Sequence, residues 1–179
     1  AGDGIGFHLY LTKPVEGPDL SGLTIRTTPV YQAMFSALGA NLVRTAPGEV
    51  YSALERGAID GYGWPSQGGW DEQTKYRVDP SFYNVDVNLL VNLDVWNGLT
   101  DAQRAKLEEG AAWMEALNAN NAEINTAEYA KQAEAGIETI TFDAAGAEKW
   151  LTTARDAGWA AVEAVDKPLA QELRACLSK

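Results

Sequence analysis

The sequence predicts an α/β fold, and three observations on residues 19–65 lead to this prediction. Two strand-then-helix units follow one another in this stretch. A glycine ends each helix, first Gly39 and then Gly57, and a short apolar run follows each glycine. Strands that alternate with helices in this way are typical of a parallel or mixed sheet covered by helices.

The first unit follows a strand expected at residues 7–11, where β propensity is high. After a turn-rich linker, residues 23–26 alternate apolar and polar side chains and predict the next strand. A helix is expected over 30–38, because Thr28 suits the N-cap and Pro29 the first helical position.

The second unit predicts a strand at 42–43, an amphipathic helix over 49–56 and a strand at 59–61. Ligands of such sheets bind beyond the carboxyl ends of the strands. Arg26 and residues 62–65 are therefore expected at the binding edge.

A long helix dominates the rest of the prediction. Residues 81–95 alternate well enough for one or two strands. Thr100 and Gln103 then form a capping box that opens a helix over 101–135, and Gly136 ends it. We expect this helix to be continuous or only gently bent, which makes it too long for one small lobe.

The C-terminal region predicts one more strand and a final helix. The strand covers residues 137–142, and Asp143 caps the helix that follows. Trp150 and Trp159 recur on this helix and are expected to pack in the core.

Composition excludes several classes of function. The 179 residues are enough for one sizeable core or two small lobes, and no stretch has the length and hydropathy of a membrane span. The formal charge of −11 argues against nucleic acid and anionic membranes as partners. Cys176 is the single cysteine, so no internal disulfide forms, and a packing or semi-exposed role is expected for it.

The motifs of common enzymes are missing from the sequence. It has no serine elbow, no phosphate-cradling glycine loop and no cluster of histidines and cysteines. His8 is the only histidine, so neither a metal site nor a catalytic base can be assembled around it from the sequence. We therefore predict no enzyme, no metal and no cofactor.

Arg26 is the residue with the clearest chemistry. Its guanidinium is a planar fork that matches a carboxylate and stays charged at any relevant pH. An arginine at the end of a buried strand needs a partner. The residues alone favour a salt bridge with an internal acid such as Asp60, and the alternative is an external anion.

The chain resembles the extracytoplasmic solute-binding proteins of tripartite ATP-independent periplasmic (TRAP) transporters. The resemblance covers most of the chain from Lys13 onward and is weaker through residues 89–99. The family pattern "DLKGLKIR", "LGA" and "GEVYxALxxGxVDG" is matched by Asp19-Leu20, Gly22-Leu23, Ile25-Arg26, Leu38-Gly39-Ala40, Glu49-Val50-Tyr51, Ala53-Leu54, Gly57 and Asp60-Gly61.

The resemblance implies a periplasmic-binding-protein fold with two lobes, mixed sheets, a lobe-spanning helix and a C-terminal helix. Family members normally carry a long segment before this region, so we expect an incomplete first lobe and an exposed apolar surface where that lobe would pack. The implied division is a cleft-crossing strand at 1–12, the second, ligand-binding lobe at 13–88, a remnant of the first lobe with the spanning helix at 89–130, and a return to the second lobe with a strand and helix at 131–179.

The function implied is capture of a small organic carboxylate, a 2-oxo acid or a related acid, in the periplasm. The carboxylate would then pass to the membrane permease subunits of a TRAP transporter. An alternative is a truncated acidic interaction domain derived from a binding protein, without a working ligand site.

The resemblance also assigns site residues. Arg26 corresponds to the arginine that clamps the ligand carboxylate in the family, which reverses the preference for a salt bridge. Trp64 lies in the tripeptide that varies with ligand class, and Gly63 replaces the acidic residue of the 2-oxo acid branch. That replacement argues against the metal ion of that branch.

Other wall residues follow from the same comparison. A second anchoring side chain often stands where this chain has Gly6, so a less polar pocket is expected. Its candidate walls are Phe7, Tyr10 and Tyr62, with plain core packing as the alternative for each. Asp86 and Asn88, on a strand that faces the cleft in the family, complete the candidates.

Overall fold

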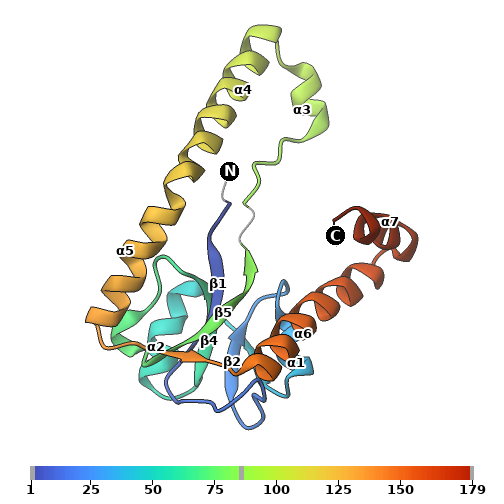
Figure 1. Cartoon of the computed structure of the whole chain (residues 1–179). Coiled ribbons are helices and arrows are strands. Elements are labelled where there is room, and N and C mark those ends of the chain that lie inside the picture. The colour runs from blue at the N-terminus through green and yellow to red at the C-terminus, as the bar shows by residue number, and fades with distance from the viewer. Residues whose placement is uncertain (1–2, 85–86, 178–179) are drawn as a thin grey trace.

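The computed structural model describes residues 3–84 and 87–177. It contains one mixed sheet with helices on both faces, and a helical arm extends away from one end of the sheet (Figure 1). Within the described residues, no helix combines the length and apolar character that crossing a membrane requires.

The sheet has six strands in the order β3-β2-β4-β1-β5-β6. The central strand β1 runs antiparallel to β4 and β5, whereas β2 runs parallel to β3 and β4, and β5 runs parallel to β6. The predicted mixed sheet is therefore confirmed. The strand bounds are β1 Gly6–Leu11, β2 Thr24–Thr27, β3 Asn41–Arg44, β4 Gly61–Pro65, β5 Tyr76–Asn84 and β6 Glu138–Thr141.

The two predicted strand-helix units are present in this one sheet. Helix α1 (Gln32–Ala37) connects β2 to β3, and the 3₁₀ turn η1 (Pro47–Glu49) with α2 (Val50–Glu55) connects β3 to β4. Helix α1 begins later than expected, with Tyr31 and not Thr28 as N-cap, because residues 29–31 form a turn. The carbonyl of Thr28 still accepts the amide of Gln32 at 3.1 Å.

Two apolar clusters hold the helices to opposite faces of the sheet. On one face, Phe35 of α1 and Trp150 of α6 (Ala144–Glu163) pack with Leu9 and Val78 of the strands. On the other face, α2 packs against Tyr10 and Tyr62. Alternation along β1 produces this division, since successive side chains point to opposite faces. Each such fully buried apolar side chain contributes about 1.5–3 kcal/mol.

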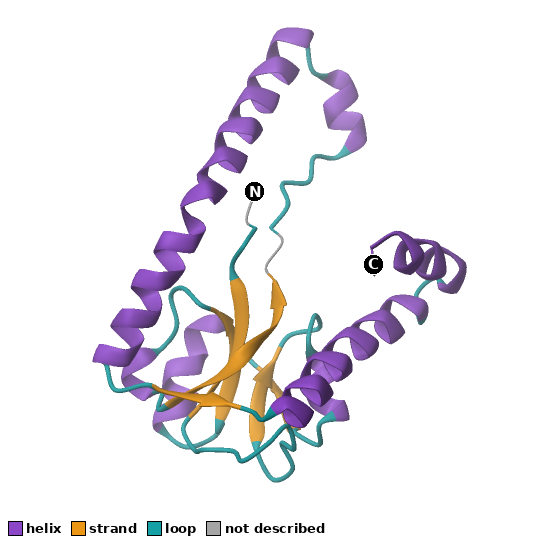
Figure 2. Ribbon diagram, in the orientation of Figure 1, coloured by secondary structure: helices purple, strands orange, loops and turns teal. Residues whose placement is uncertain are grey.

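Residues 101–134 of the arm form one long line, and residues 93–98 fold back beside its outer end, as Figure 2 shows in purple. The 3₁₀ turn η3 (Leu117–Asn120) lies within this line without breaking its direction, which agrees with the expectation of a helix that is continuous or only gently bent. Asn118 and Asn121 at this turn bond to the backbone of Asp3 and connect the arm to the segment before β1. The arm is formed by α3 Leu93–Gly98, α4 Asp101–Ala116, η3 Leu117–Asn120 and α5 Asn121–Glu134.

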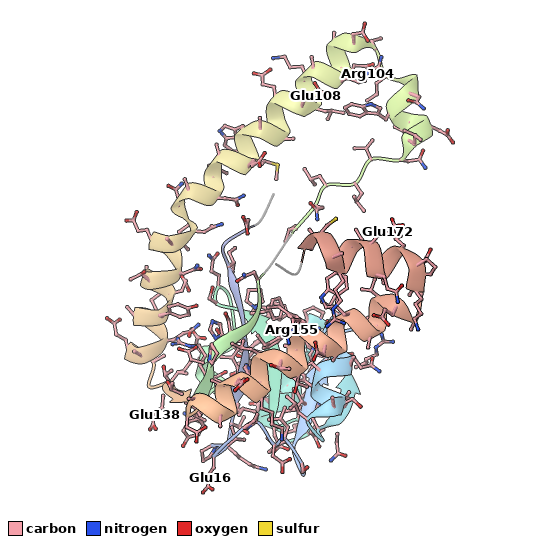
Figure 3. All side chains as sticks on the ribbon, turned by 45° about the vertical axis from the view of Figure 1, so that its right-hand side comes forward. Glu16, Arg104, Glu108, Glu138, Arg155 and Glu172 are labelled. Atoms are coloured by element: carbon pink, nitrogen blue, oxygen red, sulfur yellow. The ribbon has the colours of Figure 1, made fainter. Side chains whose placement is uncertain are left out.

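Of the strands expected over 81–95, β5 covers residues 81–84, residues 85–86 lie outside the description, and the expectation is wrong over 88–95. Residues 93–98 form α3, because the Asn92 side chain caps it by accepting the amides of Asp94 and Val95 at 2.9 and 3.2 Å. At its far end, Arg104 of α4 donates to the carbonyl of Trp96 at 3.0 Å and fixes α3 against α4. Figure 3 shows Arg104 at this turn.

The C-terminal region forms two helices where one was predicted. Asp143 caps α6, as expected, by accepting the amide of Gly146 at 2.7 Å. Trp150 is fully buried and confirms the core prediction. A separate helix α7 (Lys167–Leu177) follows and carries Cys176, which is exposed.

A polar cluster connects the sheet to α5. Its members are His8, Arg77, Asp79, Tyr129 and Gln132. The guanidinium carbon of Arg77 lies 4.1 Å from the ring centroid of Tyr129, and Arg77 also donates to Gln132 Oε1 at 2.9 Å. His8 Nδ1 faces two acceptors, Asp79 Oδ1 at 3.0 Å and the Val78 carbonyl at 3.1 Å, so Nδ1 carries a proton. The hydroxyl of Tyr129 lies 2.9 Å from His8 Nε2.

Apolar side chains are exposed along the segment before α4 and along the arm, which fits the predicted exposed apolar surface. Leu90 is the extreme case, with 92% of its surface exposed. The other exposed apolar residues of this region are Val87, Leu89, Val91, Leu93, Val95, Leu107, Trp113, Leu117 and Ile124.

Candidate ligand-binding site

Arg26 lies near the carboxyl end of β2, beside Val43 of β3 and Tyr62 of β4. Only 3% of its surface is exposed. Its Nε and Nη2 both donate to the carbonyl of Thr45 at 3.2 Å, and its Nη1 donates to the hydroxyl of Tyr31 at 3.1 Å. The guanidinium is thus buried and held in one orientation by neutral acceptors.

The alternative partner of Arg26, Asp60, belongs to another ion pair. Asp60 Oδ1 lies 2.6 Å from Lys13 Nζ, and Asp60 Oδ2 accepts the amide of Thr24 at 2.9 Å. Burial raises the pKa of Asp60, but these contacts outweigh burial and hold it below its usual value. The expectation of a salt bridge between Arg26 and Asp60 is therefore wrong. In the described part of the chain, no carboxylate forms an ion pair with Arg26.

Tyr31 does not neutralise the arginine either. Burial raises the pKa of its phenol, although the charge of Arg26 opposes this, so the hydroxyl keeps its proton at neutral pH. That proton is donated to the carbonyl of Gly63 at 2.9 Å. The site therefore contains a buried cation whose charge has no protein counter-ion among the described residues.

The donors of Arg26 are only partly used. A guanidinium has five N–H groups, and the contacts with Thr45 and Tyr31 take three of them. One N–H on each terminal nitrogen is left for a ligand. A carboxylate is the anion that such a pair of donors suits.

Trp64 forms the aromatic edge of the site. The guanidinium carbon of Arg26 lies 5.7 Å from its ring centroid, within range of a cation–π contact. Trp70 packs against the same indole with ring centroids 4.6 Å apart. Gly63 is needed beside it, because a Cβ at this position would lie 2.9 Å from the Tyr31 ring.

A cavity of about 1070 Å³ opens in front of Arg26. It brings together Phe7, Arg26 and Trp64 of the predicted site residues. The sequence analysis missed the other walls. They come from the turn before α1 (Thr28, Pro29, Val30, Tyr31), from Pro47, from the end of β5 and beyond (Tyr83, Asn84, Val87), and from α6 and the residues after it (Ala154, Arg155, Gly158, Trp159, Ala161, Val162, Val165).

The walls contributed by α6 correct one expectation. Trp159 was expected in the core beside Trp150, but it is half-buried and lines the cavity together with Val162. The spacing of these residues along the helix was a usable signal for a shared face. It did not reveal that this face lies opposite Arg26, since that depends on how α6 packs against α1 and β5.

Tyr10 and Tyr62 do not line the cavity, and their prediction as its walls is corrected. Both are fully buried on the opposite face of the sheet, where their rings stack with centroids 5.3 Å apart. Tyr62 is paired through its hydroxyl with Thr74 at 2.7 Å, and Tyr10 accepts Nε2 of Gln132 at 3.2 Å. Period-two alternation places Tyr10 away from Phe7 and Leu9.

The remaining candidates lie outside the cavity or outside the description. Asn88 is exposed and is not among the lining residues. Asp86 falls outside the described residues. At Gly6, an added Cβ would lie 3.0 Å from that of Ser81, so the strands leave little space for a second anchor. Across residues 3–84 and 87–177, no cluster of three or more His, Cys, Asp or Glu could hold a metal ion.

Comparison with known proteins identifies the family. The profile of bacterial extracellular solute-binding proteins, family 7, matches residues 6–162. A monocarboxylate 2-oxoacid-binding periplasmic protein of Nostoc is 33% identical over 88 residues, which cover 45% of this chain and 24% of that protein. A solute-binding protein of Chromohalobacter salexigens is 31% identical over 137 residues, which cover 65% of this chain and 40% of that protein.

The fold agrees with this assignment. A TRAP periplasmic solute-binding protein of Bordetella bronchiseptica, with ligand density assigned to pantoate, superposes with a TM-score of 0.75 at 27% identity. The match covers 97% of this chain and 60% of that one, so the chain spans about three fifths of the length of this relative. The chain belongs to the bacterial extracellular solute-binding protein family 7, a family of transport proteins and not of enzymes.

Proposed function

We propose that this chain captures a small organic carboxylate, a 2-oxo acid or a related acid, and that Arg26 is the anchor of its carboxylate. One observation carries the proposal: a buried guanidinium with no described counter-ion faces a cavity with N–H groups to spare. Phe7, Gly63 and Trp64 would shape the space around the anchor.

The setting proposed is transport outside the cytoplasmic membrane. In the periplasm, the bound acid would pass to the membrane permease subunits of a TRAP transporter. The sheet with its helices would act as the ligand-binding lobe, and the arm would belong to the other lobe. The relatives supply this setting, since both the Nostoc and the Bordetella proteins are described as periplasmic binding proteins.

The test is calorimetric titration of the chain with pyruvate, pantoate and succinate, in the parent and in Arg26→Ala and Arg26→Lys. Removing one side of a buried charge pair costs about 2–5 kcal/mol. At about 1.4 kcal/mol per tenfold, Arg26→Ala is expected to weaken binding roughly thirtyfold or more. Arg26→Lys keeps the charge but loses the fork, so it is also expected to bind more weakly.

Arg56→Ala is the matched control. Arg56 is an exposed arginine at the end of α2, which packs on the opposite face of the sheet, and it does not line the cavity. Its removal should leave the affinity nearly unchanged. If Arg26→Ala binds like the parent but unfolds at lower urea concentration, Arg26 is a structural residue and the proposal is wrong. Failure of the parent to bind any carboxylate would favour an interaction domain without a ligand site.

A further inference from the structure

One buried positive charge is available to a ligand among the described residues that line the cavity. Of the two arginines that line it, Arg26 is buried and has no described counter-ion, whereas Arg155 pairs with Asp156 and is largely in solvent. Figure 3 shows Arg155 on α6. No lysine or histidine is among the described lining residues, and Arg44 lines a second, smaller pocket on the other side of Thr28 and Pro29. A second carboxylate on a ligand that lies along these walls would therefore be desolvated without a cation of the described walls to receive it.

Beyond Arg26 the walls are mainly apolar on both sides, with Thr28, Asn84 and Arg155 as the polar exceptions. The strands contribute Phe7, Trp64 and Tyr83, and the helical side contributes Trp159, Val162 and Val165. The hydroxyls of Tyr31 and Tyr83 already donate to backbone carbonyls, those of Gly63 and Ala154, at 2.9 and 3.1 Å. A ligand with many hydroxyl groups would find few free partners on these walls.

The volume of the cavity favours a ligand that has a sizeable group attached to its carboxylate. A cavity of about 1070 Å³ leaves space beyond the anchor that an acid of three carbons does not fill. Several wall residues are also exposed, including Val30 at 73% and Val162 at 42%. An apolar body would cover these side chains and remove them from water.

From these three observations we infer that the ligand is a monocarboxylate with an apolar body of aromatic or branched-chain size. The inference rests on the proposed function, because Arg26 must hold the carboxylate. It adds what the rest of the ligand is: a hydrocarbon group between the β-strand wall and α6, carrying neither a second charge nor a row of hydroxyls.

The first test compares four acids on the full chain by calorimetry or saturation-transfer NMR. Phenylacetate and 4-methylpentanoate represent the inferred class, succinate adds a second carboxylate, and gluconate adds hydroxyls. We expect both apolar acids to bind at least about tenfold more tightly than succinate and gluconate, since small changes in an apolar pocket are worth this much. All binding should weaken in Arg26→Ala.

A matched pair of variants on α6 tests the wall. Val162→Lys places a second cation in the cavity, so phenylacetate should lose at least about tenfold in affinity while succinate gains. Leu151→Lys is the control, because Leu151 lies on the same helix with 44% exposure, against 42% for Val162, but does not line the cavity. Its affinities should match the parent.

The outcomes separate this inference from the proposed function. Tighter binding of succinate or gluconate, still dependent on Arg26, overturns the apolar ligand and leaves carboxylate capture in place. Absence of any Arg26-dependent binding among the four acids overturns both. Phenylacetate binding that is unchanged in Arg26→Ala identifies a nonspecific apolar patch and also overturns the inference.

Discussion

The hydroxyl of Tyr31 accepts a hydrogen bond from Nη1 of Arg26 at 3.1 Å and donates one to the carbonyl of Gly63 at 2.9 Å. Tyr31 thus connects the anchor on β2 to the glycine on β4 through one buried oxygen. The contact explains how a charged side chain can be held in place without an acid.

The first prediction concerns this oxygen. Tyr31→Phe leaves the Gly63 carbonyl and one Arg26 donor unpaired in a buried place, which costs about 1–3 kcal/mol of unfolding free energy. Urea unfolding measures this cost. Tyr51→Phe is the control, because the Tyr51 hydroxyl makes only exposed contacts, with Glu72 and Gln73, and its loss should change little. Equal effects of the two changes would contradict the role given to Tyr31.

The second prediction concerns the space at Gly63. Gly63→Ala would bring a methyl group to 2.9 Å from Cε2 and 3.0 Å from Cζ of Tyr31. Overpacking of this kind costs about 1–3 kcal/mol, and the displaced ring should also weaken carboxylate binding. In Gly110→Ala, on α4, the new methyl meets nothing within 4 Å, so helix propensity should stabilise the chain by about 0.5–1 kcal/mol. Thermal unfolding of both variants decides this; a neutral Gly63→Ala would refute the close contact.

The third prediction is a pH dependence from Asp79. Burial raises its pKa, but hydrogen bonds and charge from His8 and Arg77 outweigh burial and lower it below the ordinary value. A lowered folded-state pKa gives stability that is present above the unfolded pKa of about 3.9 and is lost as pH falls through the folded pKa. Asp79→Asn should therefore lower the free energy of unfolding by about 1.5–3 kcal/mol at pH 7, and by less as the pH falls below about 4.

Urea unfolding of parent and variant from pH 7 to pH 3 measures this difference. Asp101→Asn serves as the control, because the Asp101 side chain is fully exposed in its pair with Arg104 and should contribute little at any pH. A difference between parent and Asp79→Asn that stays constant down to pH 3 would show that the carboxylate charge is not involved.

The fourth prediction concerns the exposed apolar residues. Leu90→Ser removes an apolar side chain that is 92% exposed, so the free energy of unfolding should change by no more than about 0.5 kcal/mol. The fluorescence of a bound hydrophobic dye should fall, because the exposed apolar surface shrinks. The corresponding change at buried Leu9, Leu9→Ser, should instead unfold the protein or destabilise it strongly. Strong destabilisation by Leu90→Ser would mean that this segment is packed in solution.

The sheet and its helices on 19–65 could be predicted because their signals are local. Gly39 ends α1 with a φ of 86°. The apolar residues Val50, Ala53 and Leu54 recur at helical spacing in α2. The 3₁₀ turn at Leu117–Asn120 was not predicted. Its asparagines, Asn118 and Asn121, bond to Asp3, a contact between residues far apart in sequence that no local pattern reveals.

The binding site could likewise be predicted only in part from the sequence. Arg26, Trp64 and Phe7 follow from a motif and its neighbours, and the structure gathers them at one cavity. Tyr10 and Tyr62 were misplaced because an aromatic residue on a strand does not reveal which face is the core. Trp159 and Val162 reach the cavity only through the packing of α6 on α1, which no local pattern encodes.

The line formed by α4, η3 and α5 (Figure 1) joins the sheet near its α5 end, where Tyr129 and Gln132 contact His8 and Arg77. Residues 101–134 at about 1.5 Å each give a rod of about 50 Å, so a tilt of about 5° at the base moves the tip by about 4 Å. A small change in the tilt of this line at the sheet would therefore correspond to a displacement of α3 by several ångströms. The stiffness of the whole set of contacts at the sheet, and not of one cation–aromatic pair, therefore sets how precisely the outer end of the arm is placed.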